Sequence, residues 1–107
     1  MTRKFVHFGM VTKDKNFPGL NYNEILDCYC SDPAADPNTV EWLYFPETCP
    51  LSKTPLATGG HIAYVVDDLA AAVEGKDCIV PPTEVAPGIK IAFFIEDGAL
   101  TEYCQVG

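Results

Sequence analysis

Two short segments of the sequence resemble each other, and each begins with one of the two histidines of the chain. Residues 7–14 read HFGMVTKD and residues 61–68 read HIAYVVDD, a shared pattern of His, apolar, small, apolar, Val, two variable residues and Asp. A glutamate follows each segment, in the triplet VEW at Glu41 and in TEY at Glu102. Two neutral imidazoles and two carboxylates suit a divalent metal ion. The repeat therefore predicts a metal centre formed by His7, Glu41, His61 and Glu102.

Each of these residues also has an ordinary structural explanation. A single histidine at the start of a strand is usually a structural residue, and a single glutamate on a strand is usually solvated. Four such residues at matched places in both halves are harder to explain in this way. Glu41 also shares its face of the strand with Leu43 and Phe45, and a carboxylate on an apolar face needs a partner. Ligand type alone does not choose among Zn, Ni, Co, Mn and Fe(II).

Strand-like segments carry all four residues. In the first half, β-branched and aromatic residues predict strands over 3–11, 25–31 and 40–45, with a loop over 14–23 and a turn region over 32–38. In the second half, the pattern predicts a strand over 61–66, a helix over 69–74 capped by Asp67 or Asp68, and strands over 78–80, 90–96 and 99–105. The prolines at 81 and 82 are expected to end the strand over 78–80, and Asp97-Gly98 predicts a hairpin turn.

The predicted fold is an α+β domain of paired βαβββ modules that form a curved mixed sheet. Its 107 residues are expected to make one domain, with a first module over 1–50, a linker over 51–60 and a second module over 61–107. The first module retains little or none of its helix. When the first and last strands of a module lie near each other, a histidine from one and a glutamate from the other converge on one point.

The second half resembles the vicinal oxygen chelate (VOC) superfamily, which includes glyoxalase I, methylmalonyl-CoA epimerase, extradiol dioxygenases and the bleomycin resistance proteins. The resemblance rests on HIAYVVDDL at 61–69, on Pro81-Pro82, on PGIKIAFF at 87–94 and on DGALTEYCQ at 97–105. The first module matches mainly through His7 and Glu41. The resemblance implies a glyoxalase-like fold and places the four residues where the glyoxalase I branch has its metal ligands. It also implies self-association, for which we expect a homodimer.

The resemblance and the ligand set together predict a metal-dependent lyase or isomerase that acts on a small carbonyl compound. In this chemistry a proton leaves the carbon beside a carbonyl, and the metal stabilises the resulting enediolate. Either Glu41 or Glu102 is the expected base, and the resemblance favours Glu102. Family members that use glutathione or CoA hold these anionic thiols with basic side chains, whereas this chain has Arg3 as its single arginine and only a few lysines.

Two other functions remain open. A non-catalytic protein of the bleomycin-resistance type would sequester a cationic ligand in an acidic, aromatic groove, and Trp42, Tyr44 and Phe45 suit that task. Such a protein does not need the two histidines and two glutamates. A ring-cleaving dioxygenase would use two histidines and one carboxylate on Fe(II), in which case Glu41 would not be a ligand.

The charge and the cysteines narrow the expected partners and location. Fifteen acidic residues against seven basic ones give a formal charge of −8, which argues against a nucleic-acid or membrane partner. Five cysteines, an odd number, together with the lack of a signal-like apolar stretch at the start, predict reduced thiols and a cytoplasmic protein. Cys28 and Cys30 are expected to be small buried residues on one face of a strand.

Overall fold

The computed structural model describes residues 2–107 and divides the chain into two compact units. The unit that we call the N-terminal unit is His7–His61. The C-terminal unit contains Ile62–Gly107 together with the start of the chain up to Val6. The boundaries fall inside two strands, so that the first strand of the chain contributes residues to both units.

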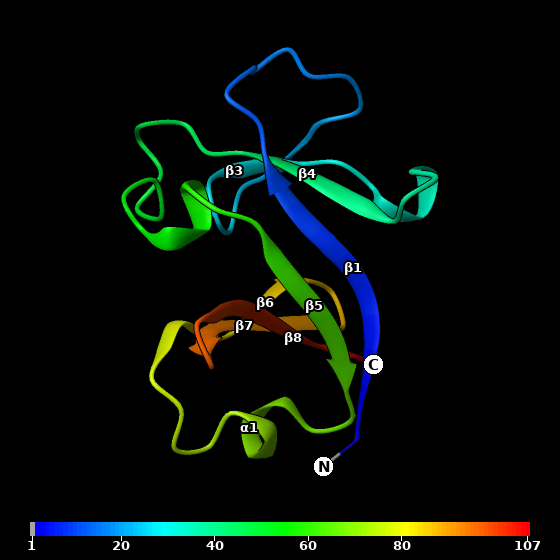
Figure 1. Ribbon diagram of the computed structural model, residues 1–107, viewed down its shortest axis with the longest axis vertical. Helices are drawn as coiled ribbons and strands as arrows, with labels where there is room; N and C mark the ends of the chain where they lie inside the picture. The colour runs from blue at the N-terminus through cyan, green and yellow to red at the C-terminus, as the bar shows by residue number, and fades with distance from the viewer. Residues whose placement is uncertain (1) are drawn as a thin grey trace. The chain divides into compact units, whose positions relative to one another are not determined.

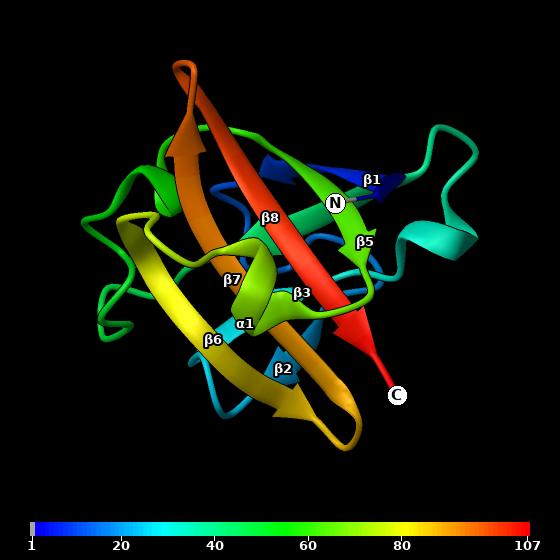
Figure 2. The same cartoon turned by 90° about the horizontal axis from the view of Figure 1, so that it is seen from below.

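The C-terminal unit contains the complete βαβββ module that the sequence predicts. Its elements are β5 (His61–Val66), which begins on the last residue of the N-terminal unit, α1 (Leu69–Ala72), β6 (Cys78–Ala86), β7 (Ile89–Glu96) and β8 (Ala99–Val106). The strands are ordered β5-β8-β7-β6, with β5 parallel to β8 and the other two pairs antiparallel. Figure 2 shows α1 lying over the curved strands of this unit.

The main hydrophobic core lies between α1 and one face of these strands. Although α1 is a single turn, it carries Leu69, which is only 1% exposed, and Val73 follows directly after it. Both pack against the sheet in a buried cluster that also contains Val66, Ala92, Phe94 and Tyr103. Burying a side chain of this size contributes about 1.5–3 kcal/mol. The short helix is therefore held by tertiary packing, since four residues have little helical stability of their own.

Local signals fix the helix start and the last hairpin as the sequence predicts. Asp68 is the N-cap of α1, and its carboxylate accepts a hydrogen bond from the backbone N–H of Ala71. Asp97 and Gly98 both have positive φ, 51° and 81°, in the two-residue turn between β7 and β8. This is the conformation that matches the twist of the flanking strands and that Asp-Gly favours.

The predicted end of the strand over 78–80 is wrong, because β6 continues through Pro81 and Pro82 to Ala86. The sheet tolerates these prolines because β6 is the outermost strand and pairs only with β7. An edge strand has one side without a ladder, so a missing backbone N–H costs little there. The pairing also shifts register between Val80 and Thr83, which accommodates both prolines in an irregular stretch.

The N-terminal unit has strands that correspond to β5 and β8, but its described residues form no α-helix between them. Its strands are β1 (Arg3–Val11), which starts in the C-terminal unit, β2 (Asn21–Asn23), β3 (Cys28–Cys30) and β4 (Val40–Tyr44), in the order β2-β3-β4-β1. β1 and β4 are parallel, and the other pairs are antiparallel. Figure 1 shows β3 and β4 together in this unit. The described residues 12–20 form a loop without a helix, as predicted for a trimmed module.

Two details of this unit differ from the prediction. The strand predicted over 25–31 is limited to β3, because Asp27 adopts the left-handed conformation with φ 54° just before it. The short strand β2 lies within the segment predicted as a loop. The turn regions contain two short 3-10 helices, Pro33–Ala35 and Pro55–Ala57. No helix among the described residues is long and apolar enough to cross a membrane.

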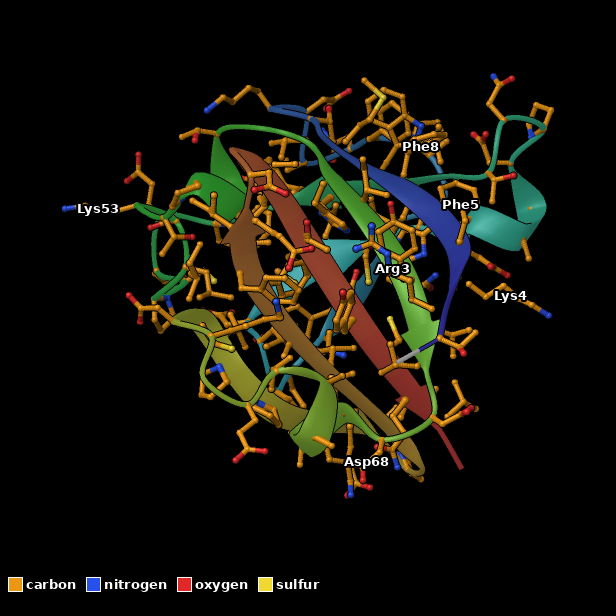
Figure 3. All side chains as sticks on the ribbon, turned by 60° about the horizontal axis from the view of Figure 1, so that its bottom comes forward. Arg3, Lys4, Phe5, Phe8, Lys53 and Asp68 are labelled. Carbon is orange, nitrogen blue, oxygen red and sulfur yellow. The ribbon has the colours of Figure 1, made fainter. Side chains whose placement is uncertain are left out.

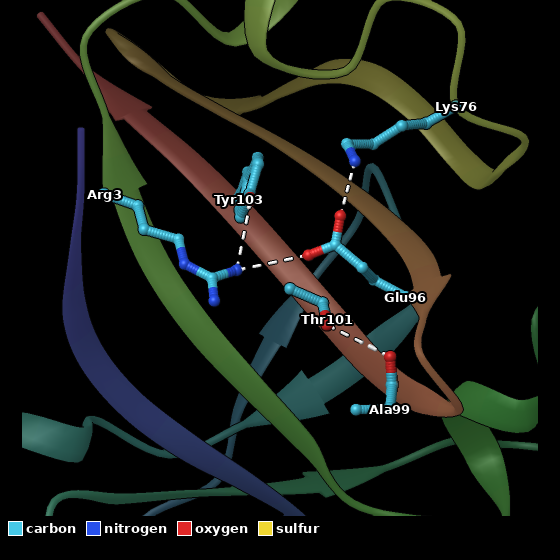
Figure 4. A network of polar contacts seen from close by, with 6 residues as sticks. All are labelled: Arg3, Lys76, Glu96, Ala99, Thr101 and Tyr103. Atoms are coloured by element: carbon cyan, nitrogen blue, oxygen red, sulfur yellow. Dashed lines mark hydrogen bonds and ion pairs between the residues drawn. The ribbon is translucent and has the colours of Figure 1, made fainter. Parts of the chain in front are cut away.

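A polar network on the C-terminal unit attaches the start of β1 to the other strands. The guanidinium of Arg3 donates to the hydroxyl of Tyr103 over 3.2 Å and pairs with Glu96 over 3.3 Å, while Lys76 pairs with the other oxygen of Glu96 (Figure 4). Arg3 also lies 4.2 Å from the centroid of the Tyr64 ring, a cation–π contact. Arg3 and Phe5 are labelled on β1 beside β5 in Figure 3. The single arginine is thus committed to a structural role.

We expect Glu96→Gln to lower the free energy of unfolding by about 1 kcal/mol or less at neutral pH, because its ion pairs are partly exposed. Lys76 chiefly, and Arg3 in addition, hold the pKa of Glu96 below its usual value. A lowered pKa in the folded state gives stability that is present above the ordinary value and lost as pH falls through the lowered one. Urea unfolding at neutral and acidic pH measures the difference, with Glu74→Gln as the exposed control. An unchanged difference at acidic pH contradicts this assignment.

Candidate metal centre

Three of the four predicted ligands lie together inside the N-terminal unit. Nε2 of His7 is 3.4 Å from Oε1 of Glu41, and Nε2 of His61 is 3.8 Å from the same oxygen. The two imidazole rings lie edge to face with their centroids 5.6 Å apart. His7 and His61 are 6% and 4% exposed, so both rings are buried. The structure therefore brings two imidazole nitrogens to one carboxylate oxygen in a sheltered place.

Strand register explains why His7 and Glu41 meet. In the parallel pair of β1 and β4, Gly9 is aligned with Glu41. Side chains alternate along a strand, so His7, two residues before Gly9, projects from the same face as Glu41. Gly9, which is aligned with Glu41, adds no side chain of its own between the two residues. A one-residue shift in this pairing would turn Glu41 to the opposite face.

Gly9 also makes room for the second imidazole. A Cβ at this position would lie 2.0–2.4 Å from Cε1, Nδ1 and Nε2 of His61, far closer than atoms can approach. The ring of His61 thus packs directly on the backbone of β1. Gly60, just before His61, is similarly tight, since a Cβ there would come within 2.8 Å of the carbonyl oxygen of Gly9. Gly9, the small residue inside the first copy of the repeated motif, is therefore required for His61 to reach its position.

The three side chains fit a divalent metal ion in donor type and spacing. Donors held at about 2.1 Å from one ion are separated by roughly 3.0–3.5 Å, depending on the coordination angle. The separation between His7 and Glu41 is 3.4 Å, and the donor atoms of all three residues lie within 4.8 Å of one another. A contraction of a few tenths of an ångström at His61 would complete the fit. Imidazole and carboxylate donors together accept Zn, Ni, Co, Mn and Fe(II).

The fourth predicted ligand, Glu102, is placed on β8 by the same kind of register. Ala63 of β5 is aligned with Glu102 in the parallel pair of β5 and β8. Ala63 is fully buried, and Glu102 is 6% exposed. The second half of the chain thus repeats the arrangement of the first. In each half a small residue is aligned with a glutamate on the neighbouring strand, and a histidine precedes that small residue by two positions.

The cysteines are free thiols, and one of them lies near the candidate ligands. Cys28 is 2% exposed, and burial above all raises its pKa to about 12, with smaller contributions from charges that include Glu41. Such a thiol stays protonated and unreactive at neutral pH. Cys30 lies on the same face of β3 but is half-buried. Cys104 contacts Glu102, with Sγ 3.4 Å from Oε2.

Two pockets of the N-terminal unit contain the three aromatic residues predicted to serve a cationic ligand. Trp42 lines a pocket of about 390 Å³ together with Phe17, whose ring centroid is 4.8 Å away, and with Asp32 and Asp36. Tyr44 and Phe45 instead line a pocket of about 510 Å³. The sequence analysis did not single out Phe17, because it lies in a loop without a periodic pattern.

The larger pocket lies at the carboxyl ends of β1 and β4. Lys13 and Lys53 line it together with Glu47, so it contains both signs of charge. Lys53 extends away from the ribbon in Figure 3. The lining therefore does not concentrate positive charge in the way that would suit a strongly anionic ligand.

Comparison with known proteins shows the fold. Neither protein-family models nor curated proteins match the sequence. Among solved structures, a hypothetical protein from Bacillus halodurans matches with a TM-score of 0.67 and 17% identity over 100% of this chain and 96% of its own. Methylmalonyl-CoA epimerase from Mycobacterium tuberculosis matches with a TM-score of 0.64 and 14% identity, over 97% of this chain and 88% of its own.

A third solved structure carries the name of the superfamily. This glyoxalase/bleomycin resistance protein/dioxygenase superfamily member from Vibrio splendidus has a TM-score of 0.52 and 13% identity, over 97% of this chain and 99% of its own. The chain therefore has the glyoxalase-like fold of the VOC superfamily. The resemblance predicted from the repeat is confirmed at the level of the fold.

Gly9→Ala is expected to destabilise the protein by about 1–3 kcal/mol, because the added methyl group must push the buried ring of His61 aside. Urea unfolding measures this loss, and the NMR signals of the His61 ring report its displacement. Gly59→Ala is the matched control, since a Cβ there meets nothing closer than 3.8 Å. Equal stability of the two variants would show that Gly9 does not support His61 as described.

Proposed function

We propose that this protein is a metal-dependent lyase or isomerase that moves a proton next to the carbonyl group of a small substrate. The observation that carries the proposal is the approach of two buried imidazoles to one carboxylate oxygen, over 3.4 Å and 3.8 Å. Two imidazole nitrogens and a carboxylate oxygen that converge in a buried place are a donor set that a divalent cation prefers. The fold supports the same conclusion, because one similar structure is an epimerase.

In this proposal Glu102 is the fourth metal ligand. Two observations support it. Glu102 is a buried carboxylate, 6% exposed, on a strand whose neighbours on the same face are largely apolar, such as Ala63 and Phe93. Its register position also matches that of Glu41. Glu102 is aligned with Ala63 in the second module, as Glu41 is aligned with Gly9 in the first.

The proposed chemistry divides the work between the two glutamates. A divalent metal, when bound, polarises the substrate carbonyl and stabilises the negative charge that develops on its oxygen. Glu41 lies against both imidazoles through one oxygen, which suits a fixed ligand. Glu102 is the carboxylate that accepts the proton from carbon and returns it to the same or the neighbouring carbon.

The charges of the protein favour a small substrate without a large anionic group. Arg3 is the single arginine and is engaged with Glu96, Tyr103 and Tyr64. A bidentate clamp on a phosphate or carboxylate is therefore absent from the described residues. Hydroxyketones and hydroxyaldehydes of a few carbons provide the two adjacent oxygens that a chelating metal binds.

The purified protein is expected to bind one divalent ion per chain, measured by elemental analysis and by calorimetric titration with Co²⁺ or Zn²⁺. His61→Ala, Glu41→Gln and Glu102→Gln should each weaken binding by at least about tenfold, since the first removes a donor and the others replace an anionic oxygen with a neutral amide. Removing the ion with a chelator should lower the thermal midpoint, because the ion binds only the folded protein.

Glu74→Gln controls for loss of one exposed negative charge in this titration. Wild-type protein that binds no ion, with a thermal midpoint insensitive to chelator, would overturn the proposed function. Binding that is lost in His61→Ala and Glu41→Gln but kept in Glu102→Gln would limit the site to three residues and remove Glu102 from it.

Loaded with metal in D₂O, the protein should exchange the carbon-bound proton of a small hydroxyketone, such as dihydroxyacetone, for deuterium. Proton NMR follows this exchange directly. At saturating metal, Glu102→Gln should slow it by about 10²–10⁴-fold, the usual contribution of a positioned base. Glu41→Gln should act mainly through metal affinity. The reverse order of the two variants would assign the base to Glu41.

One observation favours the alternative of a non-catalytic binding protein. The pocket of about 390 Å³ combines the Phe17 and Trp42 rings with two carboxylates, Asp32 and Asp36, a setting that suits an organic cation. In the exchange experiment such a protein shows no proton exchange, and cationic ligands rather than Co²⁺ raise its thermal midpoint. The dioxygenase alternative has less support, because Glu41 lies beside both imidazoles instead of apart from them.

A further inference from the structure

A thiol contacts one of the proposed ligands. Cys104 and Glu102 are two residues apart on β8, so their side chains project from the same face of the strand. The thiol of Cys104 donates a hydrogen bond to Oε2 of Glu102, with Sγ and the oxygen 3.4 Å apart. Cys104 is half-buried, and Glu102 is buried. The contact therefore lies in a sheltered place, where a hydrogen bond to a carboxylate has a larger effect than in water.

The first module has no counterpart to this thiol. The residue two positions after Glu41 is Leu43, which is 6% exposed and offers no donor. Glu41 is instead approached through Oε1 by both imidazoles. The two glutamates thus occupy matched register positions, but the residue two positions further along the strand is a thiol after Glu102 and a leucine after Glu41. The repeat is broken at the position that would control how the carboxylate is oriented.

The terminal torsion of a glutamate is soft, so a carboxylate without a fixed partner turns easily. A hydrogen bond to one oxygen restricts that rotation and selects the other oxygen to face a metal ion. A thiol is a weak donor, and it can orient the carboxylate while leaving it free to shift during proton transfer. Groups that orient a ligand in this way commonly change metal affinity when they are removed.

We propose that Cys104 is a positioning residue, which holds Oε2 of Glu102 so that Oε1 is presented to the metal. This inference rests on the proposed function, because it takes Glu102 to be a metal ligand. It assigns to the second module a device that the first module lacks, and it distinguishes the carboxylate that moves the proton from the one that stays fixed.

The test is a titration of the full chain with Co²⁺ alone, read by calorimetry and by the visible absorption of the bound ion. Cys104→Ala should weaken binding by about threefold to tenfold, the effect of one hydrogen bond of ordinary strength, because a thiol is a weak donor. Its spectrum should change, because the geometry around the ion changes. Cys104→Ser keeps a donor and should stay within about twofold of wild type. Cys78→Ala is the matched control, a half-buried thiol packed against the core.

Double variants decide whether the thiol acts through Glu102. In a Glu102→Gln background, Cys104→Ala should add no further loss of affinity, whereas in a Glu41→Gln background it should add its full effect. Cys104→Val fills the same space without a donor and replaces the alanine variant if that variant does not fold.

Three outcomes overturn the inference alone, provided that wild type binds Co²⁺. They are an affinity of Cys104→Ala equal to wild type, a loss in Cys104→Ser as large as in Cys104→Ala, and a full additional loss in the Glu102→Gln background. Wild-type protein that binds no Co²⁺ overturns the proposed function and this inference with it, so the two failures are distinguished by the first titration.

Discussion

The candidate site depends on the parallel pairing of the first and last strands within each module. That pairing aligns Gly9 with Glu41 in one module and Ala63 with Glu102 in the other. A histidine two residues before each small residue is then on the same face as the glutamate, because side chains alternate along a strand. The intervening strands and loops matter to the site chiefly because they return the chain to the edge of the first strand in the correct direction. Parallel neighbours require such a crossover, which explains the length of each module.

The two modules stabilise this pairing by different means. In the C-terminal unit, α1 covers one face of the sheet and buries large side chains such as Phe94 and Tyr103. In the N-terminal unit, the corresponding face has no helix, and the loop residue Phe17 packs on Trp42 instead. Phe8 and Met10 on the same face of β1 remain 46% and 45% exposed. The unit that holds both imidazoles therefore has the less protected sheet, and small residues such as Gly9 take over part of the positioning.

The sequence predicts the repeated strands well, because these depend on local pattern and on spacing. His61–Val66 forms a strand with the predicted bounds, and Asp97-Gly98 forms the predicted hairpin turn. The path of β6 through Pro81 and Pro82 could not be predicted, since it depends on that strand lying at the edge of the sheet. The short β3 likewise depends on the left-handed conformation of Asp27. An aspartate tolerates this conformation, but the surrounding sequence does not predict it.

The contacts that distinguish the two modules lie beyond what the repeat can predict. The motif identifies a small residue after each histidine, but only the structure shows that a Cβ at Gly9 would collide with the ring of His61. It gives each module a glutamate, but it does not predict the hydrogen bond from the thiol of Cys104 to Glu102. A symmetric set of ligands would bind a metal with equivalent carboxylates. Proton transfer needs carboxylates that differ, because one must hold the ion while the other exchanges a proton with the substrate. In the proposed function, this departure from the repeat is the feature that allows one carboxylate to hold the ion while the other moves the proton.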